Sequence, residues 1–443
     1  MRDRDSRRYV GAVRTLACRH VAHESPSRVC PHLMDPARHD VSHVRLLTGR
    51  LLEYDLACEQ CDAAGSPITL VEVCEGCVGR LNEEAEDGSF TGWRGQPGIE
   101  ERPEAVDRTV LSWRLPAGVG SVLDLAAGAG GSWLVLTEAG EIVELEPEDD
   151  RHTVVATGVL IAEPDYESYS GLPLTPRLHT SAGGRFAAVV NDYGRHGRVV
   201  DLGRSGATTL LLDSGTYRTN LVPFSLVFAE HASRTVVVHR TDWNHLDVHD
   251  AASGQLLTAR TPDEVAEGER PPHYLDYFHG RLHVSPDSRW LADDGWVWAP
   301  VGVPAVWSLE RWLNGNVWES EDGPSWLPLC ERAYRWDAPM CFVGDDRVAV
   351  SGIGSDDIAL LDGIRIFHAA TGTEVGTIAG PAGALFADRS RLYATAAGGL
   401  EIWDPVTGHR TGSVPGFVPT CHHRGAGQLG GVRDGVLHRW PTG

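Results

Sequence analysis

Residues 390–408 read SRLYATAAGGLEIWDPVTG, two short apolar segments separated by a Gly-Gly turn. Alternation of apolar and polar residues with a period of two is typical of half-buried β-strands. The second segment ends on Trp403-Asp404 and leads into Thr407-Gly408. The stretch therefore predicts a β-hairpin followed by a further tight turn.

The end of this stretch occurs twice more with the same internal spacing. Val248-His249-Asp250 leads to Ser253-Gly254, and Ile366-Phe367-His368 leads to Thr371-Gly372. Comparable hairpin patterns lie at 132–145, 184–202, 234–250 and 346–367, and amphipathic helices do not separate them. Successive hairpins of this kind predict a mainly β architecture built from repeated antiparallel sheets.

These repeats resemble the blades of WD40-type β-propellers, whose third strand ends in an aromatic residue and aspartate before an xxTG turn. The segment Val284–Ala292 resembles the turn between the first two strands of such a blade, and 180–188 is a looser version. The resemblance covers about three quarters of the chain and implies a fold, because propellers serve many functions.

Seven segments resemble the second strand of a blade, so we expect seven blades over 108–443, with six or eight as alternatives. Their marker residues are Trp133, Phe186, Thr235, Trp290, Val348, Leu392 and Leu429. One divergent blade is expected around Ala305–Leu309. The last copy has room for three strands, and Thr109–Arg114 is expected to supply its outer strand, because a closed ring leaves no unpaired edge.

The repeats depart from the WD40 pattern at positions that usually form a buried polar tetrad. Trp-Asp occurs in one copy, and a Gly-His dipeptide does not lead into the blades. We therefore expect packing of Trp, Val, Ile and Leu to hold the blades together.

A separate zinc-binding module is predicted over residues 1–85. Cys58, Cys61, Cys74 and Cys77 form two CxxC pairs twelve residues apart, as in a zinc ribbon with two hairpin knuckles. Four thiolates complete the tetrahedral shell that Zn²⁺ prefers and leave no position for a reactive water. The sequence thus predicts one structural zinc ion.

A second metal site is a further candidate in the same module. Cys18 and His20, and Cys30 and His32, form two Cys-x-His pairs, and His23 is an alternative ligand. In an extended segment, residues i and i+2 point to one face, so each pair can present sulfur and imidazole to a shared ion. The module is therefore expected to hold one zinc ion or two.

Charge and composition exclude several partner classes. The formal net charge is −22, and all 39 basic residues are arginine, which with 50 glycines indicates a bacterial origin. Such a field disfavours nucleic acid and anionic membranes. Residues 1–50 hold ten arginines and five acids, a local excess of 10 − 5 = 5, so nucleic-acid binding by this module remains an alternative. Nine cysteines without a signal peptide favour a reducing, cytoplasmic location.

Other residues give weaker signals. A third metal site or a catalytic cysteine could involve Cys330, Cys341 or Cys421-His422-His423. A catalytic acid and base could come from Asp276 with Asp287, or from Glu319, Glu321 and Asp322. Solvated or structural roles are favoured for all of these residues. Aromatic residues in two insertions are expected either to anchor a partner or to cap widened blades: His273, Tyr274, Tyr277, Phe278, Trp312, Trp318, Trp326, Tyr334 and Trp336.

The sequence as a whole predicts a zinc-binding module, a linker over 86–107, and a propeller. We expect a non-catalytic protein-interaction scaffold, and neither the protein partner nor the oligomeric state can be read from the chain. The main alternative is a hydrolase or lyase with its site at the mouth of the propeller channel. Motifs for acyl transfer, nucleotide hydrolysis or dinucleotide binding are not found in the sequence.

Overall fold

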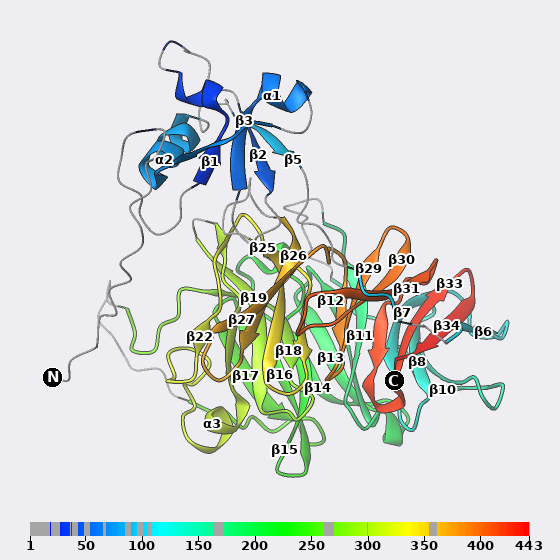
Figure 1. Cartoon of the computed structure of the whole chain (residues 1–443). Helices are drawn as coiled ribbons and strands as arrows, with labels where there is room; N and C mark the ends of the chain where they lie inside the picture. Colours follow the sequence, from blue (N-terminus) through cyan, green and yellow to red (C-terminus); the bar gives the residue numbers. More distant parts are fainter. Residues whose placement is uncertain are drawn as a thin grey trace. The chain divides into compact units, whose positions relative to one another are not determined.

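The chain forms two compact units, Met1–Ile99 and Glu100–Gly443. The structure is a computed structural model that describes residues 18, 27–35, 37, 43–47, 54–64, 68–84, 90–94, 101–104, 108–163, 172–260, 270–298, 300–353 and 361–442 (Figure 1). The division falls within 86–107, the expected linker. Part of that segment is nevertheless paired, because β5 (Phe90–Arg94) joins the sheet of the first unit and Glu101 pairs with Arg410 in the second.

The first unit contains a five-stranded sheet in the order β4-β1-β3-β2-β5. Its strands besides β5 are β1 (Ser27–Val29), β2 (His43–Leu47), β3 (Tyr54–Cys58) and β4 (Val71–Val73). Its helices are η1 (Pro31–Met34), α1 (Glu59–Ala64) and α2 (Glu75–Glu84). Val29, Leu56, Val73 and Leu81 are buried in its core together with Cys30, Cys58 and Cys77. Each CxxC pair spans a strand-to-helix turn, and the hairpin knuckles expected from a zinc ribbon are not the arrangement found here.

The second unit is mainly β, and its described residues form seven sheets. The first three are β10 (Arg151–Thr157), β9 (Glu141–Glu146), β8 (Trp133–Thr137) and β7 (Val122–Ala127); β11 (Thr175–Thr180), β12 (Phe186–Asp192), β13 (His196–Asp201) and β14 (Ala207–Asp213); and β15 (Leu226–His231), β16 (Arg234–Asp242) and β17 (His245–Asp250). The fourth sheet contains β18 (Phe278–Val284), β19 (Trp290–Val297), β20 (Val301–Gly302), β21 (Ala305–Ser308), β22 (Leu327–Pro328) and β23 (Arg332–Ala333).

The remaining three sheets have four strands each. They are β24 (Met340–Val343), β25 (Arg347–Ile353), β26 (Leu361–His368) and β27 (Glu374–Ala379); β28 (Leu385–Ala387), β29 (Leu392–Ala396), β30 (Gly399–Trp403) and β31 (Arg410–Pro415); and β32 (Cys421–His423), β33 (Gln428–Arg433), β34 (Val436–Pro441) and β6 (Leu111–Arg114). Short helices connect some strands: η3 (Leu202–Arg204), η4 (Thr219–Leu221), α3 (Leu309–Asn314) and η5 (Arg424–Ala426). Each of the seven marker residues named above lies in the second strand of its sheet.

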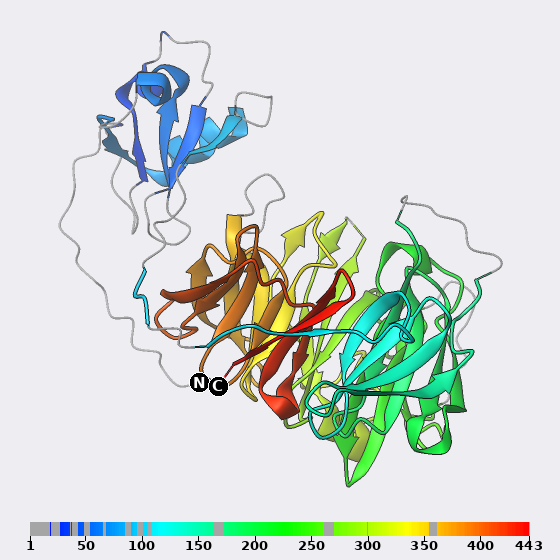
Figure 2. The same ribbon diagram turned by 90° about the vertical axis from the view of Figure 1, so that its right-hand side faces the viewer.

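Neighbouring sheets meet through their first strands. Contacts run from β7 to β11, β11 to β15, β15 to β18, β18 to β24 and β24 to β28, and β32 returns to β7. The strands β33 and β34, red in Figure 1, come to lie beside the cyan β6 and β8, and Figure 2 shows the same sheets from the side. The outer strand of the last sheet, β6, pairs antiparallel with β34, although it comes from the other end of the unit. This architecture is consistent with a propeller.

The repeated Asp-x-x-(Ser/Thr)-Gly motif forms a tight turn after the third strand. The Asp250 carboxylate accepts hydrogen bonds from the backbone and hydroxyl of Ser253, and Asp404 accepts from the Thr407 hydroxyl at 2.7 Å. Gly254 and Gly408 follow with φ of 70° and 75°, a region that glycine adopts without a steric penalty. The spacing of this motif is therefore set by local turn chemistry.

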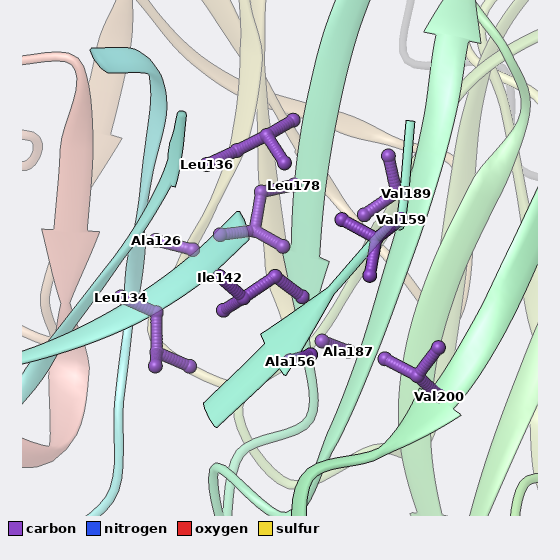
Figure 3. Close-up of a cluster of buried hydrophobic side chains, with 10 residues drawn as sticks. All are labelled: Ala126, Leu134, Leu136, Ile142, Ala156, Val159, Leu178, Ala187, Val189 and Val200. Carbon is purple, nitrogen blue, oxygen red and sulfur yellow. The ribbon is translucent and has the colours of Figure 1, made fainter. Parts of the chain in front are cut away.

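Apolar side chains fill the space between adjacent sheets. Between the first two sheets, Leu134, Leu136 and Ile142 of one sheet pack against Leu178 and Val189 of the next (Figure 3). The strands present these residues because successive side chains alternate between the two faces of a sheet. This packing is of the kind that the sequence predicts.

Buried carboxylates also link neighbouring sheets. Asp124 of β7 accepts a hydrogen bond from the Leu178 backbone N–H at 2.9 Å, Asp192 of β12 accepts from Phe224 at 3.1 Å, and Asp294 of β19 accepts from Ala338 at 2.6 Å. The second and third of these N–H groups lie just before the first strand of the next sheet. Because buried backbone donors need an acceptor, Asp192 and Asp294 fix where the chain enters the next sheet, and Asp124 fixes the position of β11 beside β7.

Asp294 also forms an ion pair with the guanidinium of Arg332, and both side chains are completely buried. Arg332 donates a further hydrogen bond to the Ser351 carbonyl oxygen at 2.9 Å. Burial raises the pKa of Asp294 above its ordinary value. This pair ties the fourth sheet to the fifth.

Replacing Asp294 by Ala should destabilise the second unit by about 3–5 kcal/mol, because it leaves the buried Arg332 guanidinium without its counter-ion and the Ala338 N–H without its acceptor. Thirteen of the chain's 14 tryptophans follow residue 100, so urea denaturation followed by tryptophan fluorescence reports on this unit. Asp149→Ala is the matched control, since Asp149 is exposed and has an ordinary negative φ, and its loss should cost less than about 0.5 kcal/mol. Equal losses in the two variants would contradict the assigned role of Asp294.

Candidate functional site

The first unit brings two CxxC pairs to two separate groups of metal-ligand residues. In the first group, the ligand atoms of Cys30, His32, Cys58 and Cys61 all lie within 4.8 Å of one another. The His32 Nδ1 is 3.1 Å from the Cys61 sulfur and 3.8 Å from the Cys58 sulfur. Three sulfurs and one imidazole nitrogen therefore converge on a common centre.

The second group contains Cys18, Cys74 and Cys77, whose sulfurs also lie within 4.8 Å of one another. The Cys74 backbone N–H points to the Cys18 sulfur at 3.5 Å. His20 and His23 lie outside the described residues. The structure thus places three sulfurs of this second group.

The grouping corrects the one expected from sequence. Cys58, Cys61, Cys74 and Cys77 are divided between the two groups, and Cys18 is separated from Cys30 and His32. The sheet explains the division: β1 pairs with β3 at Val29 and Leu56, and the Cys30 N–H donates to the Leu56 carbonyl oxygen at 2.8 Å. This pairing places Cys30 beside Cys58.

Both CxxC pairs use the same local geometry. The first cysteine lies at or just after the end of a strand, and the second lies in the first turn of the following helix. The Cys77 N–H donates to the Cys74 carbonyl oxygen at 3.0 Å, which closes the turn and directs both sulfurs to one side. The two-residue spacing of a CxxC pair therefore fits the turn between a strand and the helix that follows it.

The electrostatics of both groups fit a bound cation. Burial and the neighbouring Cys58 and Cys30 raise the pKa of Cys61 to about 12. Burial, Cys74 and Cys18 raise the pKa of Cys77 to about 11. Thiolates packed this closely repel one another. A divalent cation at their centre would attract each thiolate, offset that repulsion and keep the sulfurs deprotonated. Both groups could hold a metal ion.

Most of the basic first fifty residues lie outside the described part of the chain. Arg28, which is described, forms a two-point ion pair with Asp55, with an Nη2–Oδ2 distance of 2.7 Å. The structure therefore leaves nucleic-acid binding by this segment as a prediction.

The weaker candidates of the second unit are engaged in local contacts. Asp287 accepts a hydrogen bond from Ser285 at 2.7 Å, and Asp276 pairs with Arg270 at 3.4 Å. The three acids Glu319, Glu321 and Asp322 each have a different partner. Glu319 pairs with Ser325, Glu321 with Arg260, and Asp322 with His273. Burial raises the pKa of Cys341 and Cys421 to about 12, so neither is a ready nucleophile. Within the described residues, the two groups of the first unit are the sets of three or more His, Cys, Asp or Glu close enough to share an ion.

An exposed cluster of aromatic residues and arginines lies where strands of the third and fourth sheets begin and end. We call it the aromatic–arginine row; its members in spatial order are Arg270, Tyr274, Trp243, Tyr217, Arg218 and Trp298. Trp298, Tyr217 and Tyr274 are 51%, 44% and 40% exposed. Large aromatic surface in water is costly unless a partner covers it, so this row is a candidate contact surface.

A buried aromatic layer supports the row. Phe278 and Trp296 stack with centroids 4.2 Å apart, and Trp336 stacks on Trp296 at 4.9 Å. The Phe278 ring centroid lies 4.5 Å from that of Trp243 and 5.7 Å from that of Trp298. The exposed rings therefore rest on a fixed base and lose little conformational freedom on binding.

The aromatic residues singled out in the sequence divide between the two expected roles. Tyr277, Phe278 and Trp312 are buried, whereas Tyr274 and Tyr334 are exposed. Tyr217, Arg218, Trp243 and Trp298 were not anticipated, because no insertion or unusual spacing marks them. Their common feature is a position in a connection between strands, which a search of the predicted turns could have found.

Among the helices in the described ranges, none combines the length and the apolar character needed to cross a bilayer.

Comparison with known proteins gives little further information. No protein-family model matches the chain, and no curated protein is similar in sequence. Among solved structures, one entitled "Crystal Structure of Mitotic Checkpoint Complex" is similar, with 14% identity and a TM-score of 0.45 over 78% of this chain and 96% of that chain. The functional proposal therefore rests on the residues of this chain.

The buried histidines of the second unit predict a dependence of stability on pH. His239 is 2% exposed, and burial, with His249 beside it, lowers its pKa to about 4. An unfolded histidine has a pKa of about 6.5, so the unfolded state gains protons first as the pH falls. The stabilisation by neutral His239 is present above about pH 6.5 and is lost toward pH 4.

Between pH 7 and pH 5, the lowered pKa of His239 should reduce the free energy of unfolding by about 2 kcal/mol, measured as a fall in the urea midpoint. The variant His239→Gln should show a smaller fall over the same interval. His152→Gln, at an exposed position, should keep the wild-type slope. An unchanged slope in His239→Gln would show that protonation of His239 is not responsible.

Proposed function

We propose that this protein is a non-catalytic interaction scaffold, in which a seven-bladed WD40-like propeller carries a zinc-stabilised amino-terminal module. The cyclic order of contacts between the first strands, from β7 through β28 and from β32 back to β7, supports a closed ring. The pairing of β6 with β34 supports closure by a strand from the start of the unit. A closed ring of sheets gives a rigid frame for its loops.

The observation that carries this proposal is the aromatic–arginine row on its buried aromatic base. Tyr, Trp and Arg are the residues that most often dominate the binding energy of protein interfaces. A rigid base lowers the entropy cost of association. These properties are those of a recognition surface.

The ionisable groups inside the ring support a scaffold over the hydrolase or lyase alternative. His279 Nδ1 and the Asp293 carboxylate are 2.6 Å apart, but both side chains are completely buried. Arg240, also buried, donates to the His279 carbonyl oxygen at 3.2 Å. A substrate cannot reach such groups without opening the sheets. Arg240 of β16 joins the third sheet to the fourth, and the His279–Asp293 pair links two strands of the fourth sheet.

For the first unit we propose two structural zinc ions. The donor set of Cys30, His32, Cys58 and Cys61 suits Zn²⁺, whose tetrahedral sites combine thiolate and imidazole. Cys18, Cys74 and Cys77 would hold the second ion, and His20 is the proposed fourth ligand because Cys18-x-His20 repeats the spacing of Cys30-x-His32. Zinc-bound thiolates fit the reducing, cytoplasmic location that the sequence predicts.

Purified full-length protein should contain two zinc ions per chain by elemental analysis. Cys61→Ser should lower the content to about one, and Cys77→Ser should do the same, because each removes one ligand from a different group. Cys330→Ser, outside both groups, should retain two. A wild-type content of one ion, or of none, would contradict the two-site arrangement.

Crosslinking in the native organism should capture a protein partner through the aromatic–arginine row. The double variant Trp298→Ala, Tyr217→Ala should lose that partner and remain folded, with a fall in unfolding free energy of about 1–3 kcal/mol because both rings are half-buried against Phe278. Val406→Ala, at a position 79% exposed on another sheet, is the control and should keep the partner. Retention of every partner by the double variant would remove the support for a scaffold acting through this surface.

A further inference from the structure

We infer that the aromatic–arginine row binds an uncharged, proline-rich segment of a partner protein in the polyproline II conformation. This inference rests on the proposed scaffold function and adds the chemistry of the partner. Proline rings of the segment would pack against the exposed aromatic side chains. Its backbone carbonyl oxygens would accept hydrogen bonds from the hydroxyl and indole N–H groups of the row, as in other aromatic surfaces that recognise such segments.

The described charges at the row offset one another, which favours an uncharged partner. Arg270 pairs with Asp276 at 3.4 Å. Asp242 is exposed and directly precedes Trp243, so Arg218 is not the only charge in its part of the row. An acidic segment would therefore gain no net attraction here. A basic segment would be attracted to much of a molecule with a net charge of −22, and the row would not select it.

The four aromatic residues of the row each combine an apolar ring with a hydrogen-bond donor. Within the described ranges, no residue accepts a hydrogen bond from the hydroxyl of Tyr217 or Tyr274, and the same holds for the indole N–H groups of Trp243 and Trp298. A partner that covers these rings must replace water at the donors with acceptors of its own. Helices and paired strands use their carbonyl oxygens internally, whereas a polyproline II segment leaves them open to outside donors.

The spacing of the rings fits the repeat of a polyproline II segment. The Trp243 ring centroid is 5.7 Å from that of Tyr217 and 6.3 Å from that of Tyr274, and the ring planes meet at 69° and 68°. A polyproline II segment rises about 3.1 Å per residue, so every second residue advances by about 6 Å along its axis. Successive rings can thus each meet every second residue. Planes inclined this steeply do not offer the flat platform on which nucleic-acid bases stack.

Both partners in this proposed contact are ordered before they meet. Phe278 is buried, and its ring supports those of Trp243 and Trp298 from within the unit. A proline-rich segment already populates the polyproline II conformation when free. Since neither side loses much conformational freedom, a row of only four aromatic side chains can supply useful affinity.

Fluorescence anisotropy of labelled 12-residue peptides with the full-length protein tests the inference. The probe repeats Pro-Pro-Leu. One matched peptide repeats Gly-Gly-Leu and lacks the preformed conformation, and two others carry glutamate or lysine in place of half of the leucines. We expect the Pro-Pro-Leu probe to bind about tenfold more tightly than each of the other three. Its affinity should change less than about twofold when salt is raised, because no ion pair forms.

Variants of the row separate binding from folding. Trp298→Ala should lower the affinity for the Pro-Pro-Leu probe about tenfold, and Val406→Ala, on another sheet, should bind as the wild type does. The double variant Tyr217→Phe, Tyr274→Phe keeps both rings and removes both hydroxyls. Its affinity should fall about threefold or more, while its urea midpoint stays at the wild-type value. A midpoint that falls together with binding would assign the hydroxyls a structural role and overturn the inference.

Three other results would also overturn it: equal affinity for the Gly-Gly-Leu peptide, tighter binding of the glutamate or lysine peptide, or no binding of the Pro-Pro-Leu probe. The scaffold proposal is judged separately, by whether crosslinked partners are lost in Trp298→Ala, Tyr217→Ala. Loss of a partner whose contact segment contains no proline would retain the scaffold and reject the proline-rich segment.

Discussion

A hydrogen bond from a backbone N–H to a buried carboxylate of the preceding sheet is the constraint on which the second unit depends. Asp124, Asp192 and Asp294 each accept such a bond at 2.6–3.1 Å. Apolar packing is not directional and would tolerate small shifts between sheets, whereas a buried donor without an acceptor is costly. These carboxylates therefore fix the register between sheets, and the apolar clusters supply most of the burial.

Burial of so much charge has an electrostatic consequence. Asp294 and Arg332 neutralise each other without solvent, and Arg240 is buried with hydrogen bonds to the His279 carbonyl oxygen and the Ser214 hydroxyl. Burial lowers the pKa of Arg240 to about 10. Such networks add specificity more than stability, because each ion loses its hydration on folding. They join neighbouring sheets by polar contacts in addition to apolar packing.

The two units solve different stability problems. The second unit is large enough to bury a continuous apolar core between its sheets. The first unit is under a hundred residues, and its core contains Cys30, Cys58 and Cys77 beside Val29, Leu56 and Val73. Metal ions bound at two groups of sulfurs would cross-link that small core. The second unit can carry exposed aromatic side chains such as Trp298, because its stability does not depend on burying them completely.

The sequence by itself determined the strands and turns of the second unit and the identity of the candidate metal-ligand residues. Alternation of apolar residues, the Asp-x-x-(Ser/Thr)-Gly turns and the CxxC spacings depend on contacts between residues a few positions apart, so they can be read locally. Only the tertiary structure decided which candidate ligands lie together, because the pairing of β1 with β3 places Cys30 beside Cys58, and Cys18 lies beside Cys74. It also decided which aromatic residues stay exposed, since the cover that buries Phe278 and leaves Trp298 in water comes from segments distant in the chain.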